Sequence, residues 1–219
     1  MSVHLARDIE NLKKKILTLS ASVEEMVFDA IKAVQNGQRT LAEQVVQRDN
    51  EIDLMEVEIE EDCLKILALH QPVAIDLRYI VAILKINNDL ERVGDLASNI
   101  AQRAIDFTHD ASIPQPFDLQ NMAATTQAML RMSLDALIKM DETVSKRVCA
   151  MDDQVDEMHR DNFNKLIELI SGNPQKTGMY LNYLSLSRYL ERIADLATNI
   201  AEDVIYLITG QIARHKPTV

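Results

Sequence analysis

The sequence is poor in the residues that mark tight turns and sheets. It has five glycines, five prolines and no tryptophan, and aromatic residues make up only 4% of its 219 positions. A chain with so few turn-forming and aromatic residues favours long helices over sheets. Apolar residues nevertheless account for 47% of the sequence, which supplies enough side chains for a helical core. The composition therefore predicts an all-α protein.

Cysteines and long apolar runs are also scarce. The two cysteines, Cys63 and Cys149, do not form a C-x-x-C pair and are too few for the disulfide framework of a small secreted protein. We expect both to be small core residues. The N-terminus lacks a basic segment followed by an apolar one, and no uncharged apolar run approaches the ~20 residues that a membrane span needs. These absences predict a soluble, cytoplasmic protein.

The sequence has fewer basic than acidic residues. Lys and Arg total 23 against 34 Asp and Glu, so the formal net charge is −11. A surface of this charge repels the phosphate backbone of nucleic acids, and no nucleic-acid partner is expected. Cationic partners, metal ions among them, suit this charge better.

What the sequence does contain is an internal repeat. Residues 90–101, with the sequence LERVGDLASNIA, recur as LERIADLATNIA at residues 190–201, and nine of the twelve positions are identical. A shorter acidic segment, residues 49–53, recurs at residues 152–156. The two offsets, 100 and 103 residues, are nearly equal. The chain is therefore two copies of one unit.

Apolar residues recur at steps of three and four through most of the chain, which predicts six amphipathic helices. Breaks at Gly37, Pro72, residues 109–117, residues 171–174 and Gly210 separate or end them. The predicted helices cover about residues 5–35 and 40–69, a third segment ending near residue 107, residues 118–140 and 142–170, and a sixth segment ending before Gly210.

These helices are expected to form two tandem antiparallel three-helix bundles. Residues 1–108 make the first bundle, residues 118–210 make the second, and residues 109–117 are the linker between them. The residues beyond the second bundle are expected to form a loose tail. Thr40 and Glu43 match the capping-box pattern at the start of the second helix.

Each copy carries two pairs of acidic residues, one on its second helix and one on its third. The members of a pair are four residues apart, so they lie one turn apart on the same helix face. Two such pairs facing each other repel unless a cation lies between them. All-oxygen ligands suit Mg, Mn or Fe better than a structural zinc. The candidate metal ligands are Asp49, Asp53, Glu91 and Asp95 in the first copy and Asp152, Asp156, Glu191 and Asp195 in the second.

The acidic pairs also have simpler interpretations. Carboxylates four residues apart are common on solvated helix faces, and Arg92 and Arg192 are placed to neutralise them in surface ion pairs. The joint repetition of all four acidic positions favours a metal or another specific polar function. Because the copies are expected to form separate bundles, two nearly independent sites are predicted. His159 lies one turn beyond Asp156, but Glu56 takes its place in the first copy, so we interpret it as a surface histidine.

Two other functions remain open from the residues alone. A carboxylate-bridged di-metal enzyme in a helical bundle needs Glu-x-x-His pairs, and the sequence contains none. No Gly-rich loop or Ser/His/Asp arrangement indicates a nucleophilic site either, so no enzyme activity is expected. The other alternative is a metal-free structural adaptor whose acidic faces bind basic partner surfaces.

The tandem halves, each with D-x-x-x-D on its second helix and E-R-x-x-D-x-A-x-N-I-A on its third, resemble the PhoU family of phosphate-specific transport accessory proteins. The resemblance extends from the first helix to about Gly210. It implies a cytoplasmic, non-enzymatic negative regulator of phosphate uptake and of the phosphate-starvation response. Such a protein acts as an adaptor between the ATPase of the phosphate ABC transporter and a sensor histidine kinase, and it reaches the membrane only through these partners.

The resemblance also implies a homodimer and, in some family members, multinuclear metal clusters bound by the E(D)-x-x-x-D motifs. All eight acidic motif positions are intact in this sequence. The metal implied for them is divalent or trivalent, with Fe, Mn or Mg as the candidates.

Overall fold

The computed structural model describes residues 3–106 and 115–211, and these residues are almost entirely helical. No strand occurs among them, so the predicted all-α class is confirmed. The helix ends that the sequence predicted lie within two residues of those in the structure. The elements are α1 (Val3–Asn36), α2 (Arg39–His70), α3 (Ala74–Asp106), α4 (Leu119–Lys139), α5 (Glu142–Gly172), the short 3-10 helix η1 (Pro174–Lys176) and α6 (Thr177–Thr209).

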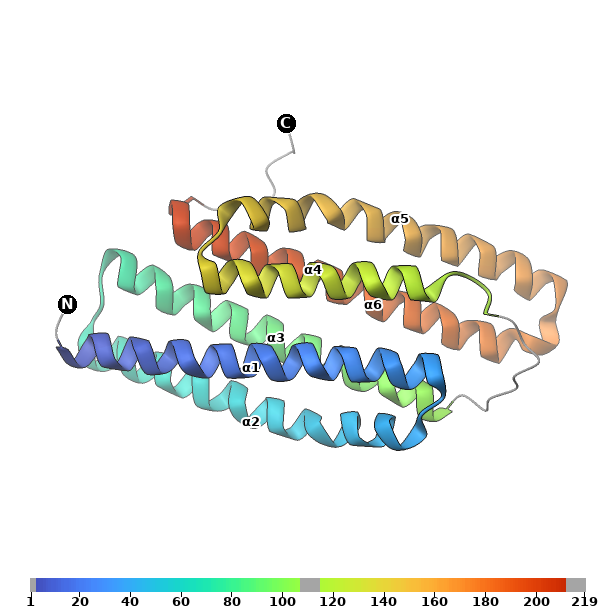
Figure 1. Cartoon of the computed structure of the whole chain (residues 1–219), viewed down its shortest axis with the longest axis horizontal. Helices are drawn as coiled ribbons and strands as arrows, with labels where there is room; N and C mark the ends of the chain where they lie inside the picture. The colour runs from blue at the N-terminus through green and yellow to red at the C-terminus, as the bar shows by residue number, and fades with distance from the viewer. Residues whose placement is uncertain (1–2, 107–114, 212–219) are drawn as a thin grey trace.

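The helices form two groups of three that lie side by side along the long axis of the molecule (Figure 1). Helices α1, α2 and α3 pack on one another, and so do α4, α5 and α6. The two groups meet mainly through α3 and α6, and α1 and α4 add a smaller contact. The third helix of each copy is therefore central, because it packs both within its own group and on its equivalent in the other.

Most of the predicted linker, residues 109–117, lies outside the described residues, and so does the tail beyond residue 211. The predicted domain limits therefore stay predictions. At the end of the linker, the buried Phe117 ring packs edge-on against Tyr183 of α6, with 5.9 Å between the ring centroids. None of the described helices combines the length and the apolar character that a membrane span requires.

Two helices end at glycine as predicted, but the predicted N-cap of α2 is not found. Gly37, with φ 62°, takes the left-handed conformation just after α1, and Gly210, with φ 72°, does so after α6. The predicted capping box is wrong: α2 begins at Arg39, and Gln38 occupies the N-cap position without a side-chain hydrogen bond. Thr40 lies within the first turn, two residues beyond the N-cap position.

The apolar seam predicted on the third helix of each copy lies in the core. Leu90, Val93 and Ile193 are completely buried. The two cysteines agree only in part with the expected core role, because Cys63 is buried and Cys149 is half-buried. Burial raises the pKa of the Cys63 thiol to about 12, so it stays protonated and acts as a small apolar side chain.

Replacing Leu90 by Ala is expected to lower the free energy of unfolding by about 2 to 5 kcal/mol, because the change leaves a cavity in a packed core. Leu54 of α2 is 68% exposed and offers a matched control, for which the same substitution should change stability by less than about 0.5 kcal/mol. Denaturant unfolding of both variants measures the difference. Equal losses at the two positions would contradict the assignment of Leu90 to the core.

The second and third helices pack closely in both copies, but a different helix carries the small residue in each copy. A methyl group added at Gly94 of α3 would lie 3.1 Å from Ile52 Cγ2 of α2, which is tighter than normal contact. In the second copy, Ala194 stands at the Gly94 position, and the smaller Val155 stands at the Ile52 position. Relative to the first copy, the third helix of the second copy gains a methyl group and its second helix loses one. The second and third helices are thereby held close at the level of the acidic pairs.

An ion pair between an exposed lysine and a buried aspartate links the two groups of helices. Lys85 Nζ of α3 lies 3.2 Å from Asp203 Oδ1 of α6, and the Asp203 side chain is only 3% exposed. The same Lys85 ammonium lies 5.4 Å from the centre of the Tyr206 ring. The repeat does not predict this pair, because Ser185 and Arg103 stand at the positions equivalent to Lys85 and Asp203.

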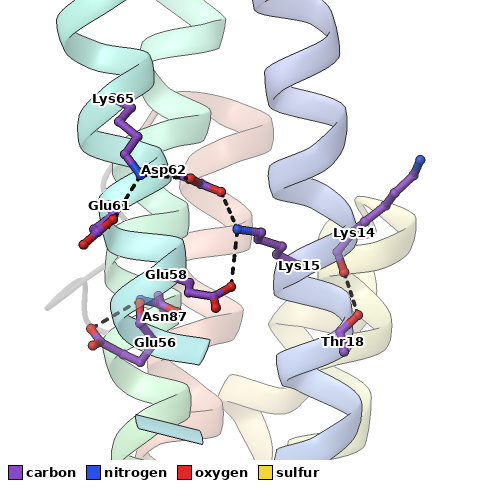
Figure 2. A network of polar contacts seen from close by, with 9 residues as sticks. All are labelled: Lys14, Lys15, Thr18, Glu56, Glu58, Glu61, Asp62, Lys65 and Asn87. Atoms are coloured by element: carbon purple, nitrogen blue, oxygen red, sulfur yellow. Dashed lines mark hydrogen bonds and ion pairs between the residues drawn. The ribbon is translucent and has the colours of Figure 1, made fainter. Parts of the chain in front are cut away.

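Ion pairs also connect α1 to α2. Lys15 Nζ lies 2.7 Å from Asp62 Oδ2 and 3.5 Å from Glu58 Oε2 (Figure 2). These groups are partly exposed, and pairs of this kind contribute at most about 1 kcal/mol each. The apolar seam, rather than this surface network, therefore holds the helices in place.

Candidate metal centre

Three of the eight predicted ligands converge in the second copy. Asp156 on α5 faces Glu191 and Asp195 on α6, and one carboxylate oxygen of each lies within 4.8 Å of the others. The convergence has a local cause: Glu191 and Asp195 are four residues apart on one helix face, and α5 packs along α6. Three carboxylates this close repel one another unless a proton or a cation is shared among them.

The electrostatics of the second copy reflect this crowding. Burial, followed by the charge of Asp195, raises the pKa of Asp152 to about 6, although the Thr198 hydroxyl, which donates to Asp152 Oδ1 at 3.2 Å, opposes the shift. Burial also raises the pKa of Asp195 to about 6, with Glu191 and Asp156 adding to it. The pKa of Glu191 is raised for the same reasons, burial first and Asp156 next.

The first copy gathers the equivalent carboxylates around Glu91. Burial raises the pKa of Glu91, and the nearby carboxylates add to this shift. Asp49 Oδ1 is buried and has no hydrogen-bond partner within the described residues. Burial likewise raises the pKa of Asp49, opposed by a hydrogen bond from Ser98 and reinforced by the charge of Asp95. The carboxylates around Glu91 are Asp95, Asp53, Glu56 and Asp49.

These observations fit a bound cation. A buried carboxylate oxygen without a partner costs free energy, and a metal ion bound to it would remove that cost. The donors are all carboxylate oxygens, in positions that range from half-buried (Asp156, Glu191) to exposed (Asp195). Mg, Mn and Fe accept such donors more readily than a structural zinc site does. The copies differ in detail, because no described trio of the first copy comes as close together as Asp156, Glu191 and Asp195.

The two motif copies share one groove. It lies between α3 and α6, has a volume of about 210 Å³, and is lined by equivalent residues from both helices. One predicted ligand of each copy, Asp95 or Asp195, lines this groove, because α3 packs on α6. That the two copies hold separate, nearly independent sites stays a prediction. The lining residues are Arg92, Asp95, Leu96 and Asn99 of α3 and Arg192, Asp195, Leu196 and Asn199 of α6.

His159 is more than the surface residue that the sequence predicted. It is half-buried, and its Nδ1 lies 2.9 Å from the hydroxyl oxygen of the buried Ser187. Asn162 donates to the same oxygen at 3.1 Å. Burial, with Arg188 next, lowers the pKa of His159, which favours the neutral ring. His159 is also not among the converging ligands, so its role in the structure is to link α5 to α6.

The first copy has a different link at the same level. Asn87 stands at the Ser187 position, and its amide donates to the Glu56 carbonyl at 2.9 Å and to Glu56 Oε1 at 3.3 Å (Figure 2). Sequence reasoning missed both links, and it also missed the hydrogen bond from Thr198 to Asp152. One signal was present: the repeat exchanges Ser98 for Thr198, which keeps the hydroxyl group at that position.

The raised pKa values predict how the stability of the metal-free protein depends on pH. The carboxyl groups of Asp152 and Asp195 have pKa values of about 6 in the folded protein and about 3.9 in an unfolded chain. Between these values the folded state binds more protons than the unfolded state, so the free energy of unfolding falls as the pH rises. We therefore expect the metal-free protein to become more stable when the pH is lowered from about 7 to about 5.

Thermal melts in a chelator across this range measure the effect. Asp195→Asn removes one of the two groups and should give a weaker pH dependence than the wild type. Asp161, an exposed residue of α5, offers a control in which the Asp→Asn change should leave the dependence unaltered. A pH dependence as strong in Asp195→Asn as in the wild type would contradict the assignment.

The chain matches the family model of the PhoU domain over residues 16–104 and again over residues 119–204. The first match lies within the span of α1 to α3, and the second lies within the span of α4 to α6. The model therefore matches most of the chain, once in each of the two groups of helices.

Several relatives carry the name of the same family. The "Phosphate-specific transport system accessory protein PhoU homolog" of Pseudomonas aeruginosa is 36% identical over 209 residues, which cover 95% of this chain and 86% of the relative. The homolog of Aquifex aeolicus is 36% identical over 214 residues, covering 97% and 96%. PhoU of Escherichia coli is 32% identical over 208 residues, covering 95% and 86%.

Solved structures agree with these matches. The crystal structure of PhoU from Pseudomonas aeruginosa superimposes with a TM-score of 0.91 at 36% identity and covers 94% of this chain and 99% of that one. The phosphate transport system regulatory protein PhoU from Streptococcus pneumoniae gives a TM-score of 0.86 at 26% identity, covering 95% and 99%. The fold described above is thus the fold of solved PhoU proteins.

The relatives are named as accessory proteins of a transport system and not as enzymes, which confirms the expectation of a non-enzymatic protein. The motif resemblance seen in the sequence is confirmed as well, because the family model and the relatives cover nearly the whole chain. This chain belongs to the PhoU family.

Proposed function

We propose that this protein is an accessory protein of a phosphate-specific transport system and a negative regulator of phosphate uptake and of the phosphate-starvation response. The observation that supports this most is the near full-length match to relatives of that name, which spans 97% of this chain and 96% of the relative from Aquifex aeolicus. The role is that of an adaptor between the ATPase of the phosphate ABC transporter and a sensor histidine kinase.

The proposed adaptor works in the cytoplasm as a homodimer and meets the membrane only through its partners. The net charge of −11 supports protein and cation partners over nucleic acid. Exposed apolar residues near the start of α3, Val73 and Ile75, offer surface for such contacts.

The acidic pairs are proposed to bind divalent or trivalent metal, with Fe, Mn or Mg as candidates. In the second copy, Asp156, Glu191 and Asp195 would hold the ion, with Asp152 beside them. In the first copy, the ligands would be Asp49, Asp53, Glu91 and Asp95. A bound cation would neutralise the repelling carboxylates and link the second helix of each copy to the third.

Affinity capture tests the adaptor role. Tagged protein is expressed in its own host at high phosphate, and bound proteins are identified by mass spectrometry. We expect the transporter ATPase and the sensor kinase in the bound fraction, and neither in a capture from cells that express the tag alone. Absence of both partners at high phosphate would contradict the proposal and favour a metal-free adaptor with other partners.

A further inference from the structure

The groove between α3 and α6 offers hydrogen-bond donors as well as carboxylates. Arg92 and Asn99 lie two turns apart on the groove-lining face of α3, and Arg192 and Asn199 repeat them on α6. Leu96 is also among the lining residues and is largely buried. The hollow therefore brings two guanidinium groups and two side-chain amides together above an apolar base.

Interactions within the protein account only in part for the two arginines. Arg92 lies 3.7 Å from Asp89 in the same helix, but the second copy has Tyr189 at the position of Asp89. Arg192 has no ion-pair contact as short as 4.0 Å among the described residues, although its positive charge opposes the rise in the pKa of Glu191 and of Asp195. The arginine is thus present in both copies although its helical partner is present in only one.

The charge around the groove determines whether these donors can bind an anion. The groove lining itself is neutral, because Arg92 and Arg192 balance Asp95 and Asp195. Glu91 and Glu191 precede the arginines in each copy, so the wider surroundings are negative. An anion is repelled as long as these carboxylates are uncompensated, and a cation bound to them reverses that effect.

We propose that this groove binds a doubly charged phosphate group, either free phosphate or a small phosphate monoester, once the carboxylates beside it hold a metal ion. The inference rests on the metal binding proposed above. Guanidinium groups match the geometry of phosphate oxygens with paired hydrogen bonds. A volume of about 210 Å³ leaves ample room for such an anion, since about 10 to 15 Å³ holds one water molecule.

Metal and phosphate binding are then coupled. If bound metal raises the affinity for phosphate, bound phosphate raises the affinity for metal by the same factor. The groove lies where the two halves of the chain meet, so the bound anion would contact both. The proposed regulator would thereby sense phosphate directly, through the site where its two halves are joined.

Equilibrium dialysis of the full chain with labelled inorganic phosphate tests the inference, with Mn²⁺ or with a chelator. A chamber with Mn²⁺ and no protein corrects for metal phosphate formed in solution. We expect saturable phosphate binding with Mn²⁺ and at least tenfold weaker binding in the chelator. Glycerol phosphate in place of phosphate distinguishes a monoester ligand from free phosphate, and either ligand supports the proposal.

Arginine variants identify the donors. The double variant Arg92→Gln, Arg192→Gln should weaken phosphate binding by about tenfold to a hundredfold per arginine. It should not weaken Mn²⁺ binding, because neither arginine is a metal ligand and the positive charge of Arg192 acts on the ligands Glu191 and Asp195. Arg131 of α4, which is 74% exposed and lies outside the groove, offers a control for which Arg→Gln leaves both affinities unchanged. Circular dichroism melts verify that the variants are folded, and Arg→Lys versions retain the charge.

Two results would overturn the inference, and they are distinguishable. If Mn²⁺ binds but phosphate does not, or if phosphate binding is insensitive to the arginine variants, the phosphate site is wrong while the proposed metal site stands. If Mn²⁺ does not bind, the proposed metal site and the metal-dependent phosphate site are both wrong.

Discussion

Replacing Asp195 by Asn is expected to remove most of the stabilisation that Mn²⁺ or Fe²⁺ gives to the wild type. Asp195 belongs both to the converging trio and to the groove lining, so the change weakens the site at its centre. A ligand at a hundredfold excess over its dissociation constant stabilises the folded state by about 2.7 kcal/mol. Loss of a supporting residue alone costs ten- to hundredfold in metal affinity, and loss of a charged ligand should cost at least as much.

The metal-free variant should be no less stable than the wild type. Asn keeps the shape of Asp and removes one of three repelling charges, so at neutral pH the repulsion within the trio falls. Thermal melts with and without metal measure both effects. Asp161→Asn, on the exposed side of α5, is the matched control and should respond to metal as the wild type does. If metal leaves the wild-type midpoint unmoved, the acidic pairs are solvated faces or partner-binding surfaces.

The shared groove adds a prediction about coupling. Asp95→Asn should weaken metal binding in the first copy, and because Asp95 and Asp195 line the same hollow, the double variant should differ from the sum of the single variants. Residues that share a network show interaction energies of about 0.5 to 3 kcal/mol, whereas distant sites add. A double-mutant cycle on the metal-induced change in midpoint tests this. Strict additivity would indicate two independent sites, as the sequence alone had suggested.

Deleting the gene from its host is expected to switch on phosphate-starvation genes at high phosphate. The sensor kinase would lose the contact through which the proposed adaptor restrains it. Reporter expression from a starvation-induced promoter measures the effect. The wild-type gene and the Asp161→Asn control should restore repression.

Complementing the same deletion strain with the Asp195→Asn gene tests whether regulation needs the metal. Failure to restore repression, with normal amounts of the variant protein, would connect the metal site to regulation. Full repression by the Asp195→Asn variant would show that regulation does not depend on the metal site. Unchanged expression in the deletion strain itself would contradict the regulatory function and favour an adaptor with other partners.

The sequence by itself determined the helices, the repeat and the acidic positions. Each of these depends on local spacing: apolar residues at steps of three and four predict a helix, and Glu191 and Asp195 share a helix face because they are four residues apart. The seam through Val93 and Ile193 was predictable for the same reason, and both residues are buried. The family resemblance followed from the doubled motif, since a twelve-residue segment that recurs with nine identical positions is specific.

Only the tertiary structure decided how the two copies are placed. Spacing along one helix does not specify which helix of the other copy it meets, and the buried residues of α3 and of α6 are alike, mostly Leu, Ile, Val and Ala. That docking brings Asp95 and Asp195 to one groove. It also pairs Lys85 with Asp203 across the halves. The repeat could not predict this contact, because a serine stands at the position equivalent to Lys85 and an arginine at the position equivalent to Asp203. Residues brought together across a duplicated fold depend on the shape of the packed surfaces, which no local pattern encodes.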